Sequence, residues 1–205
     1  MPIPTRSQCL NLMEQIGMPV HIQRHSLLVA KVAFCLGSLL NETALALNLE
    51  LIEAGALLHD IAKERSIRTG ERHDDLGARM VLELGYHRLA PIIKDHVHLD
   101  RSQLEAPITE SLLVNYSDKR VKHDRVVSLH DRFQDLIVRY AKTRDHRSRL
   151  LEKLDLFLEV EIRIFEKLTI GPADLEQLTG PGAENTWEDY ETEDEGSSIV
   201  RRQLC

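Results

Sequence analysis

The sequence predicts an all-α fold, because nearly every segment spaces its apolar residues at the helical period. No run of strict apolar and polar alternation is long enough to predict a strand. Aromatic residues make up only 4% of the chain, so Leu, Ile, Val and Ala have to build the core. At 205 residues, we expect one helical domain over residues 1–180 and a tail over residues 181–205.

Two helices are predicted at the start of the chain. The first covers residues 5–16, is short and amphipathic, and ends at Gly17. The second covers residues 20 to about 40. On it, His25 shares an apolar stripe with Leu28, Val29, Val32, Leu36 and Leu39. His25 is therefore expected to point towards the interior, where its ring needs a polar partner.

A third helix is predicted over residues 49–63, with Asn48 as its N-cap and Glu50 in its first turn. His59 shares one face of this helix with Leu51, Gly55, Leu58 and Ala62, so it is also expected to point inward. The apolar stretch AGALLHDIAK thus contains an adjacent pair of metal-capable residues, the doublet His59-Asp60.

The remaining predicted helices cover residues 74–85, 89–96, 107–122, 128–140 and 145–168. Pro107 suits the first turn of its helix. The last helix is the longest of these, and its leucine-rich face is interpreted as core or as the face of a homodimer. The elements therefore describe a helical bundle with a long C-terminal helix.

The net charge of −7 comes from the C-terminal segment. Seven acidic residues and no basic ones lie between residues 183 and 200. Without them, 26 Asp and Glu residues balance 26 Lys and Arg residues, so the body gives no electrostatic reason to bind long nucleic acid. From Gly180 onward, turn-forming and acidic residues replace aliphatic ones, and we expect this tail to be disordered.

The sequence favours a cytoplasmic location and no membrane contact. No apolar stretch reaches the length that spans a bilayer, because Lys31 interrupts the longest one. The N-terminus has no signal-peptide organisation. The three cysteines are odd in number and lack CxxC spacing, which fits a reducing compartment.

Four residues on three predicted helices carry side chains suited to one divalent cation: His25, His59, Asp60 and Asp118. A single inward histidine is more often a hydrogen-bonded core residue. The combination favours a metal, because buried carboxylates without a partner are costly and a cation would satisfy all four groups. Nitrogen and oxygen ligands suit Fe, Mn, Ni, Zn or Mg.

The order of His25, the doublet His59-Asp60 and Asp118 resembles the HD superfamily of metal-dependent phosphohydrolases. Between the doublet and Asp118, the chain also has H-x-x-x-G-A from His73 and I-x-x-H ending at His96. These elements look like the dinuclear branch, which includes HD-GYP phosphodiesterases and bacterial dinucleoside tetraphosphate hydrolases. The resemblance covers about residues 20–140. It implies a second cation held by His73 and His96, with Asp60 bridging the two ions.

Some features depart from that branch. The chain reads VHLDRSQLEAP after His96, with no HHE and no Gly-Tyr-Pro, which argues against cyclic-dinucleotide cleavage. The tetraphosphate hydrolases usually have small hydroxyl and glycine residues where Val97, His98 and Leu99 stand here. His98 is interpreted as a third nitrogen near the second metal or as a proton donor, with an ordinary loop histidine as the alternative. Alternatively, His73 is a surface residue at the start of a helix and His96 a histidine at the end of one.

Four basic residues are candidate contacts for substrate phosphate: Arg24, Lys63, Lys119 and Arg125. Lys63 lies one turn after the doublet, and each of the four could instead be a solvated surface charge. Five further histidines lack matching spacing and are expected to face solvent: His21, His87, His123, His130 and His146. The second doublet, His123-Asp124, follows a basic run and no apolar helix, so we exclude it as a metal site.

These residues predict a metal-dependent phosphohydrolase that acts on a small phosphorylated metabolite or nucleotide. A hydroxide bound to the metal ions would attack phosphorus. Asp60, Lys63 and His98 would be the catalytic residues. One alternative is a non-catalytic regulatory module that binds metal or nucleotide through the same residues, and another is a nucleotidase with one metal.

Overall fold

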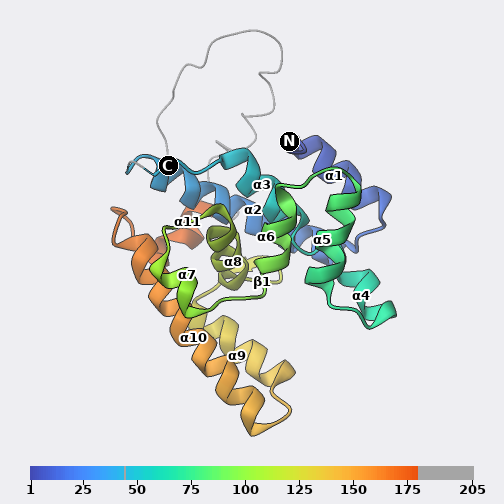
Figure 1. Cartoon of the computed structure of the whole chain (residues 1–205). Coiled ribbons are helices and arrows are strands. Elements are labelled where there is room, and N and C mark those ends of the chain that lie inside the picture. The colour runs from blue at the N-terminus through green and yellow to red at the C-terminus, as the bar shows by residue number, and fades with distance from the viewer. Residues whose placement is uncertain (44, 180–205) are drawn as a thin grey trace.

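A computed structural model describes residues 1–43 and 45–179 and is built almost entirely from α-helices, as the sequence predicted (Figure 1). The tail expected over residues 181–205 lies outside the described residues. Among the described residues, no helix is both long and apolar enough to cross a membrane.

The core forms where α2 (Val20–Asn41) packs against α3 (Leu49–Leu58) and α8 (Glu110–Arg120). Leu36 of α2 and Leu57 of α3 are fully buried there. Around this centre lie α1 (Arg6–Gln15), which packs on α3, and the pair α5 (His73–Glu83) and α6 (Leu89–Asp95), which pack on each other. The aliphatic core expected from the low aromatic content is therefore confirmed.

The predicted third helix is wrong at its C-terminal end. It stops at Leu58, and α4 (Lys63–Thr69) begins a separate helix. In between, the Ile61 amide donates to the Leu58 carbonyl at 3.0 Å and the Lys63 amide donates to the Asp60 carbonyl at 2.9 Å. These bonds span three residues instead of four, so the chain tightens into turns. The doublet therefore lies in a turn between two helices.

Several short elements were not predicted, among them α4, a further helix after α6 and a hairpin after α8. Residues Arg101–Glu105 form α7, which begins with a capping box at Asp100. The predicted helix from residue 107 instead begins at Glu110, because the Thr109 side chain accepts the Leu112 amide and caps it there. Strands β1 (Val121–Lys122) and β2 (Arg125–Val126) form an antiparallel hairpin.

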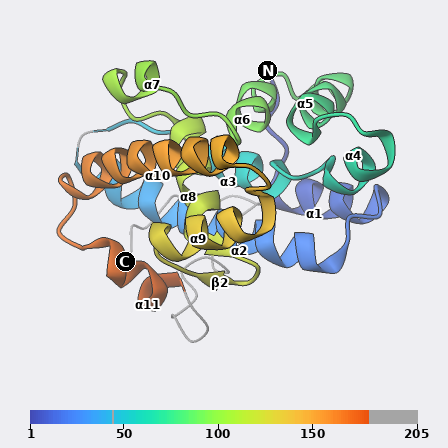
Figure 2. The same ribbon diagram turned by 90° about the horizontal axis from the view of Figure 1, so that it is seen from below.

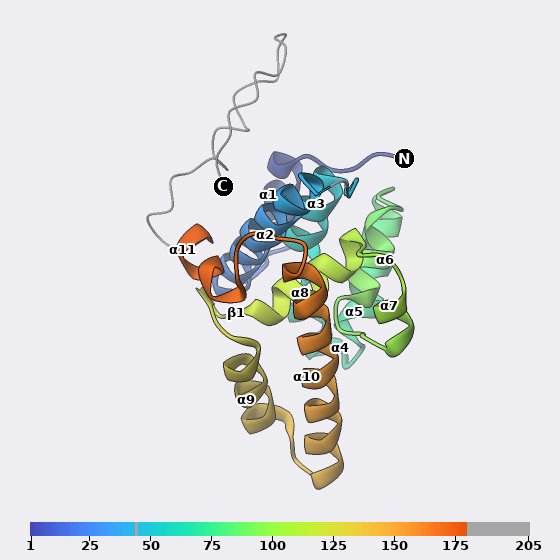
Figure 3. The same cartoon turned by 90° about the vertical axis from the view of Figure 1, so that its left-hand side faces the viewer.

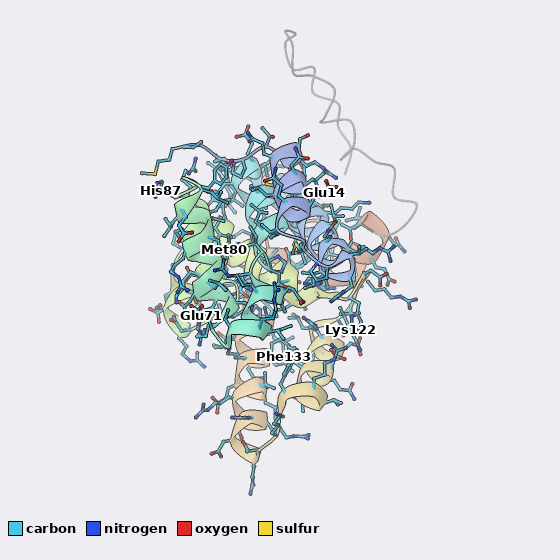
Figure 4. All side chains as sticks on the ribbon, turned by 90° about the vertical axis from the view of Figure 1, so that its right-hand side faces the viewer. Glu14, Glu71, Met80, His87, Lys122 and Phe133 are labelled. Carbon is cyan, nitrogen blue, oxygen red and sulfur yellow. The ribbon has the colours of Figure 1, made fainter. Side chains whose placement is uncertain are left out.

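Two helices, α9 (Leu129–Tyr140) and α10 (Arg144–Phe165), form a hairpin whose tip extends away from the rest of the described chain (Figures 1 and 3). Figure 2 shows α10 running across α8 and α9. Phe133 lies at the base of this hairpin, and its ring centroid is 5.7 Å from that of Phe157 (Figure 4). The last described elements are η1 (Pro172–Asp174) and α11 (Leu175–Thr179).

The buried Arg120 guanidinium fixes the hairpin to the core. It donates to Glu161 of α10 at 2.9 Å and to the carbonyls of Val127 and Pro172, both at 2.8 Å. It also donates to the Tyr116 hydroxyl at 2.7 Å, which itself donates to Glu161 at 2.6 Å. This network ties α10 and the C-terminal segment to α8, next to Asp118.

Candidate metal centre

The structure brings all six predicted metal ligands together in two groups. The first group contains His25, His59 and Asp118, and the second contains Asp60, His73 and His96. Within each group, the candidate ligand atoms lie within 4.8 Å of one another. Five of the six side chains are buried, and His73 is partly exposed.

Packing of separate elements creates this convergence. His25 lies in the second turn of α2, His73 begins α5, and His96 follows the last residue of α6. Helix α5 approaches α6 closely because Gly77 has no side chain: a β-carbon there would lie 2.9 Å from Ile93 Cγ2. The neighbour that requires this glycine is thus the side chain of Ile93.

The first group is arranged around Asp118. Asp118 Oδ1 lies 3.0 Å from His25 Nε2 and 3.7 Å from His59 Nε2. His59 Nε2 also lies 3.5 Å from Asp60 Oδ2. Ligand atoms about 2.1 Å from one cation lie roughly 3 to 3.5 Å from each other, so these spacings are suitable for a metal.

The second group is arranged around the other oxygen of Asp60. Asp60 Oδ1 lies 3.5 Å from His73 Nε2 and 3.6 Å from His96 Nε2. The two Nε2 atoms lie 3.1 Å apart. The two carboxylate oxygens of Asp60 therefore face different groups, which is the arrangement that a bridging ligand requires.

Backbone carbonyls set the tautomers of three histidines. Nδ1 of His59 donates to the Ala56 carbonyl at 2.7 Å, and Nδ1 of His96 donates to the Ile93 carbonyl at 2.5 Å. Nδ1 of His25 donates to the His123 carbonyl at 3.1 Å. Because a carbonyl can only accept, each neutral ring keeps an unprotonated Nε2 that points into the centre.

His59 provides the test of whether the residues fit a cation. Its ring is 1% exposed, and Nε2 has no hydrogen-bond partner in the part of the chain that the structure describes. The nearest charged atoms are carboxylate oxygens, which cannot donate a hydrogen bond. A buried lone pair that faces carboxylates is costly unless a cation lies between them. The site therefore fits a metal.

The local electrostatics hold His59, His73 and Asp60 in the protonation states that metal binding needs. Burial lowers the pKa of His59 from 6.5 to about 3, against the opposing effect of Asp60 and Asp118. Burial likewise lowers the pKa of His73 to about 4. Burial alone would raise the pKa of Asp60, but His59 and Lys63 hold it well below its usual range. The neutral imidazoles of His59 and His73 thus face the ionised carboxylate of Asp60.

Two of the four candidate phosphate contacts touch the centre. Lys63 Nζ lies 3.2 and 2.9 Å from the two carboxylate oxygens of Asp60. Lys119 contacts Asp118 and donates to the His96 carbonyl at 3.1 Å. Arg24 and Arg125 are exposed, and among the described residues neither makes a hydrogen bond or ion pair with a member of the centre.

His98 lies beside the second group and not in it. Its Nε2 lies 3.0 Å from Asp74 Oδ2 and 2.5 Å from Arg72 Nη2, and Arg72 donates to the same carboxylate at 2.8 Å. Asp74 is 1% exposed, and although burial would raise its pKa, the bonds from Arg72 and His98 lower it to about 2. Arg72 and Asp74 were not predicted as part of the site, although they directly flank His73.

The five other histidines are exposed, as the sequence predicted. His87 lies at the edge of the molecule in Figure 4. His123 is exposed as well, but its carbonyl has a role that no residue pattern indicated, since it is the acceptor for His25.

Known proteins place this chain in a family. Residues 22–136, more than half of the chain, match the HD domain family. The chain is also 29% identical over 109 residues to the uncharacterized protein MJ0778 of Methanocaldococcus jannaschii, which covers 50% of this chain and 63% of that protein. It thus spans less than two thirds of that relative's length. No solved structure matches the chain significantly. HD domains are typically metal-dependent hydrolases that bind divalent cations, and this protein belongs to the HD domain family.

Proposed function

We propose that this protein is a phosphohydrolase that uses two divalent cations to cleave a phosphate ester or anhydride bond of a small metabolite, namely a nucleotide. One cation would be held by His25, His59 and Asp118, and the other by His73 and His96, with Asp60 bridging both. The observation that supports this most strongly is the orientation of Asp60, whose two oxygens face two separate groups of ligand atoms.

The cations, when bound, supply Lewis acidity that lowers the pKa of water and neutralises phosphoryl oxygens. Water forms the new bond to phosphorus and loses a proton, while the bond from phosphorus to the leaving oxygen breaks. Lys63, which lies 2.9 Å from Asp60 Oδ2, is positioned to stabilise charge on the transferred group. His98, oriented by Asp74, is the candidate that gives the leaving oxygen its proton.

The identity of the metal, the nucleotide and the oligomeric state stay predictions. Ligation by nitrogen and oxygen suits Fe, Mn, Ni, Zn and Mg alike. A cytoplasmic location remains a prediction from the cysteine pattern. A homodimer remains a prediction from the leucine-rich last helix, and the absence of long nucleic acid as a partner remains one from the neutral body. The absence of membrane contact remains a prediction from the lack of a bilayer-spanning apolar stretch.

The test compares Asp60→Ala with Asp124→Ala, because the chain contains a second, exposed His-Asp doublet that serves as a matched control. We expect the wild-type protein to bind about two metal ions per chain and to release phosphate from members of a nucleotide panel with Mn or Fe(II) under anaerobic conditions. Asp60→Ala should lose metal and slow hydrolysis by about 1000-fold, while keeping a helical circular-dichroism spectrum. Asp124→Ala should retain both properties.

Full activity of metal-depleted Asp60→Ala would contradict the proposal. Tight nucleotide binding without turnover in any metal would instead support the non-catalytic regulatory module. A content of about one metal per chain, combined with hydrolysis, would support the nucleotidase with a single cation.

A further inference from the structure

Three positively charged side chains from separate elements surround the segment His96–His98. Lys119 of α8 donates to the His96 carbonyl at 3.1 Å, and Lys153 of α10 donates to the Val97 carbonyl at 3.2 Å. Arg72, directly before α5, lies 2.5 Å from the ring of His98. Three consecutive residues, the first of them a metal ligand in the proposed function, are thus each contacted by one positive side chain.

These three side chains differ in whether a carboxylate balances their positive charge. Arg72 pairs with Asp74 at 2.8 Å, and Lys119 pairs with Asp118. Lys153 has no carboxylate within ion-pair distance among the described residues, and its one side-chain hydrogen bond goes to the neutral Val97 carbonyl. Burial, followed by repulsion from Lys119 and Arg72, lowers the pKa of its ammonium group.

An uncompensated, partly buried cation beside two others has two explanations. Lys153 could simply attach α10 to the loop after α6 through its bond to Val97. A neutral donor would do this at a lower cost of desolvation, because it would not face two further positive charges. Alternatively, Lys153 could bind an anion together with Lys119 and Arg72. Attraction of each side chain to that anion would then offset the repulsion among the three positive charges.

Lys153 comes from a different part of the chain than the metal centre. It lies on α10, outside residues 22–136, which match the HD domain family. Helix α10 therefore adds to the site a residue that the matched domain does not contain.

We propose that Lys153, with Lys119 and Arg72, forms a second phosphate subsite beside the metal centre. The substrate class is therefore a metabolite with at least two phosphate groups, such as a nucleoside polyphosphate or bisphosphate. This inference rests on the proposed function, because it assigns the attacked phosphate to the metal centre and Lys63. The further phosphate binds at Lys153 and remains intact in the reaction.

The experiment measures how binding depends on the number of phosphates. Orthophosphate, pyrophosphate and tripolyphosphate are titrated by calorimetry into the full-length protein as purified, with its metal content held equal between variants. We expect the wild-type protein to bind tripolyphosphate at least about tenfold more tightly than orthophosphate, since one additional charged pair contributes about that factor.

Lys153→Met should remove most of that tenfold preference, with only a small change in orthophosphate affinity. Lys153→Arg keeps the positive charge and should keep the preference. Lys167→Met removes an exposed charge just beyond the end of the same helix and serves as the matched control, with the wild-type preference expected. In hydrolysis, Lys153→Met should raise KM for nucleoside triphosphates more than for p-nitrophenyl phosphate.

Equal loss of affinity for all three anions in Lys153→Met would overturn the proposal and assign Lys153 a structural role. An unchanged preference in Lys153→Met would overturn it as well. If Lys153→Met does not fold, Arg72→Gln supplies the same comparison, and a retained preference there contradicts the subsite. The binding result is independent of turnover, so a protein that hydrolyses nothing refutes the proposed function and leaves the subsite to be decided by these affinities.

Discussion

The chain contains two His-Asp doublets that have the same residues and opposite environments. In the first, His59 and Asp60 are 1% and 3% exposed and lie in the turn between α3 and α4. In the second, His123 and Asp124 are exposed in the turn between β1 and β2. Nδ1 of His59 donates to the Ala56 carbonyl, and its Nε2 faces the carboxylate of Asp60. Nε2 of His123 instead lies 2.9 Å from Arg139.

This difference shows that burial and neighbouring ligands, and not the two residues alone, make a His-Asp doublet a candidate metal site. The apolar helix α3 carries the first doublet into the core, where burial lowers the pKa of His59 and four ligands arrive from other elements. The second doublet contributes to the same site only through the backbone, because the His123 carbonyl accepts Nδ1 of His25. Substitutions of the His123 and Asp124 side chains are therefore expected to leave the site intact.

Among changes to the histidines of the two doublets, the largest effect is expected from replacing each histidine with glutamine. His59→Gln removes a ligand atom from the first group, so hydrolysis should fall at least about 100-fold and one metal should be lost. His123→Gln keeps its carbonyl, so activity and metal content should stay within about twofold of the wild-type values. Phosphate release and elemental analysis measure both. Comparable losses of activity and metal in the two variants would contradict the different roles assigned to the two doublets.

Metal removal should give the next largest effect. A ligand present at about 1000 times its dissociation constant stabilises the folded state by about 4 kcal/mol. For a domain of this size, chelation should therefore lower the thermal midpoint by roughly 10 °C. The same treatment should not change the midpoint of Asp60→Ala, while Asp124→Ala should respond as the wild-type protein does. Differential scanning calorimetry with and without chelator decides this.

Acid should destabilise the metal-free protein through the first doublet. Burial holds the pKa of His59 near 3 in the folded state, far below the 6.5 of an exposed histidine. The unfolded chain therefore binds more protons, so stability is fully present above pH 6.5 and falls as the pH decreases towards 3. Between pH 6.5 and 4, the thermal midpoint of metal-free wild-type protein should drop more steeply than that of metal-free His59→Gln. Parallel slopes would contradict the assigned cause.

The smallest effect is expected at the second doublet. His123 has a φ of 57°, a left-handed conformation that costs a side chain about 1 kcal/mol and costs glycine little. His123→Gly should therefore raise the thermal midpoint by roughly 3 °C while leaving the carbonyl for His25 and the activity in place. His123→Ala, which keeps the strain, is the control. A loss of activity in His123→Gly would show that the side chain matters.

The sequence predicted helices most reliably where apolar periodicity was long. The predicted second and last helices correspond to α2 and α10, because hydrogen bonds within a helix and its apolar stripe depend on residues three or four positions apart. It missed short elements such as α7, α11 and the β-hairpin, since elements of five and two residues carry too little periodic signal. It also extended the third helix through the doublet, although the chain tightens there into a turn.

The types of ligand residue were likewise readable from the sequence, since spacing and resemblance named all six that the structure brings together. Their role as metal ligands stays a prediction. Arg72, Asp74 and Lys153 were not predicted as part of the site, because nothing in their local sequence separates them from ordinary surface charges. They gain their relation to the site only when α5 and α10 pack beside the segment after α6.

The sequence by itself determined the helical architecture and the chemical types at the centre, because both depend on local spacing and residue identity. Only the tertiary structure decided that the two oxygens of Asp60 face different ligand groups, that the His123 carbonyl orients His25, and that Lys153 faces two other cations. Such relations join residues many positions apart. They follow from how helices pack in three dimensions, which no local pattern of residues specifies.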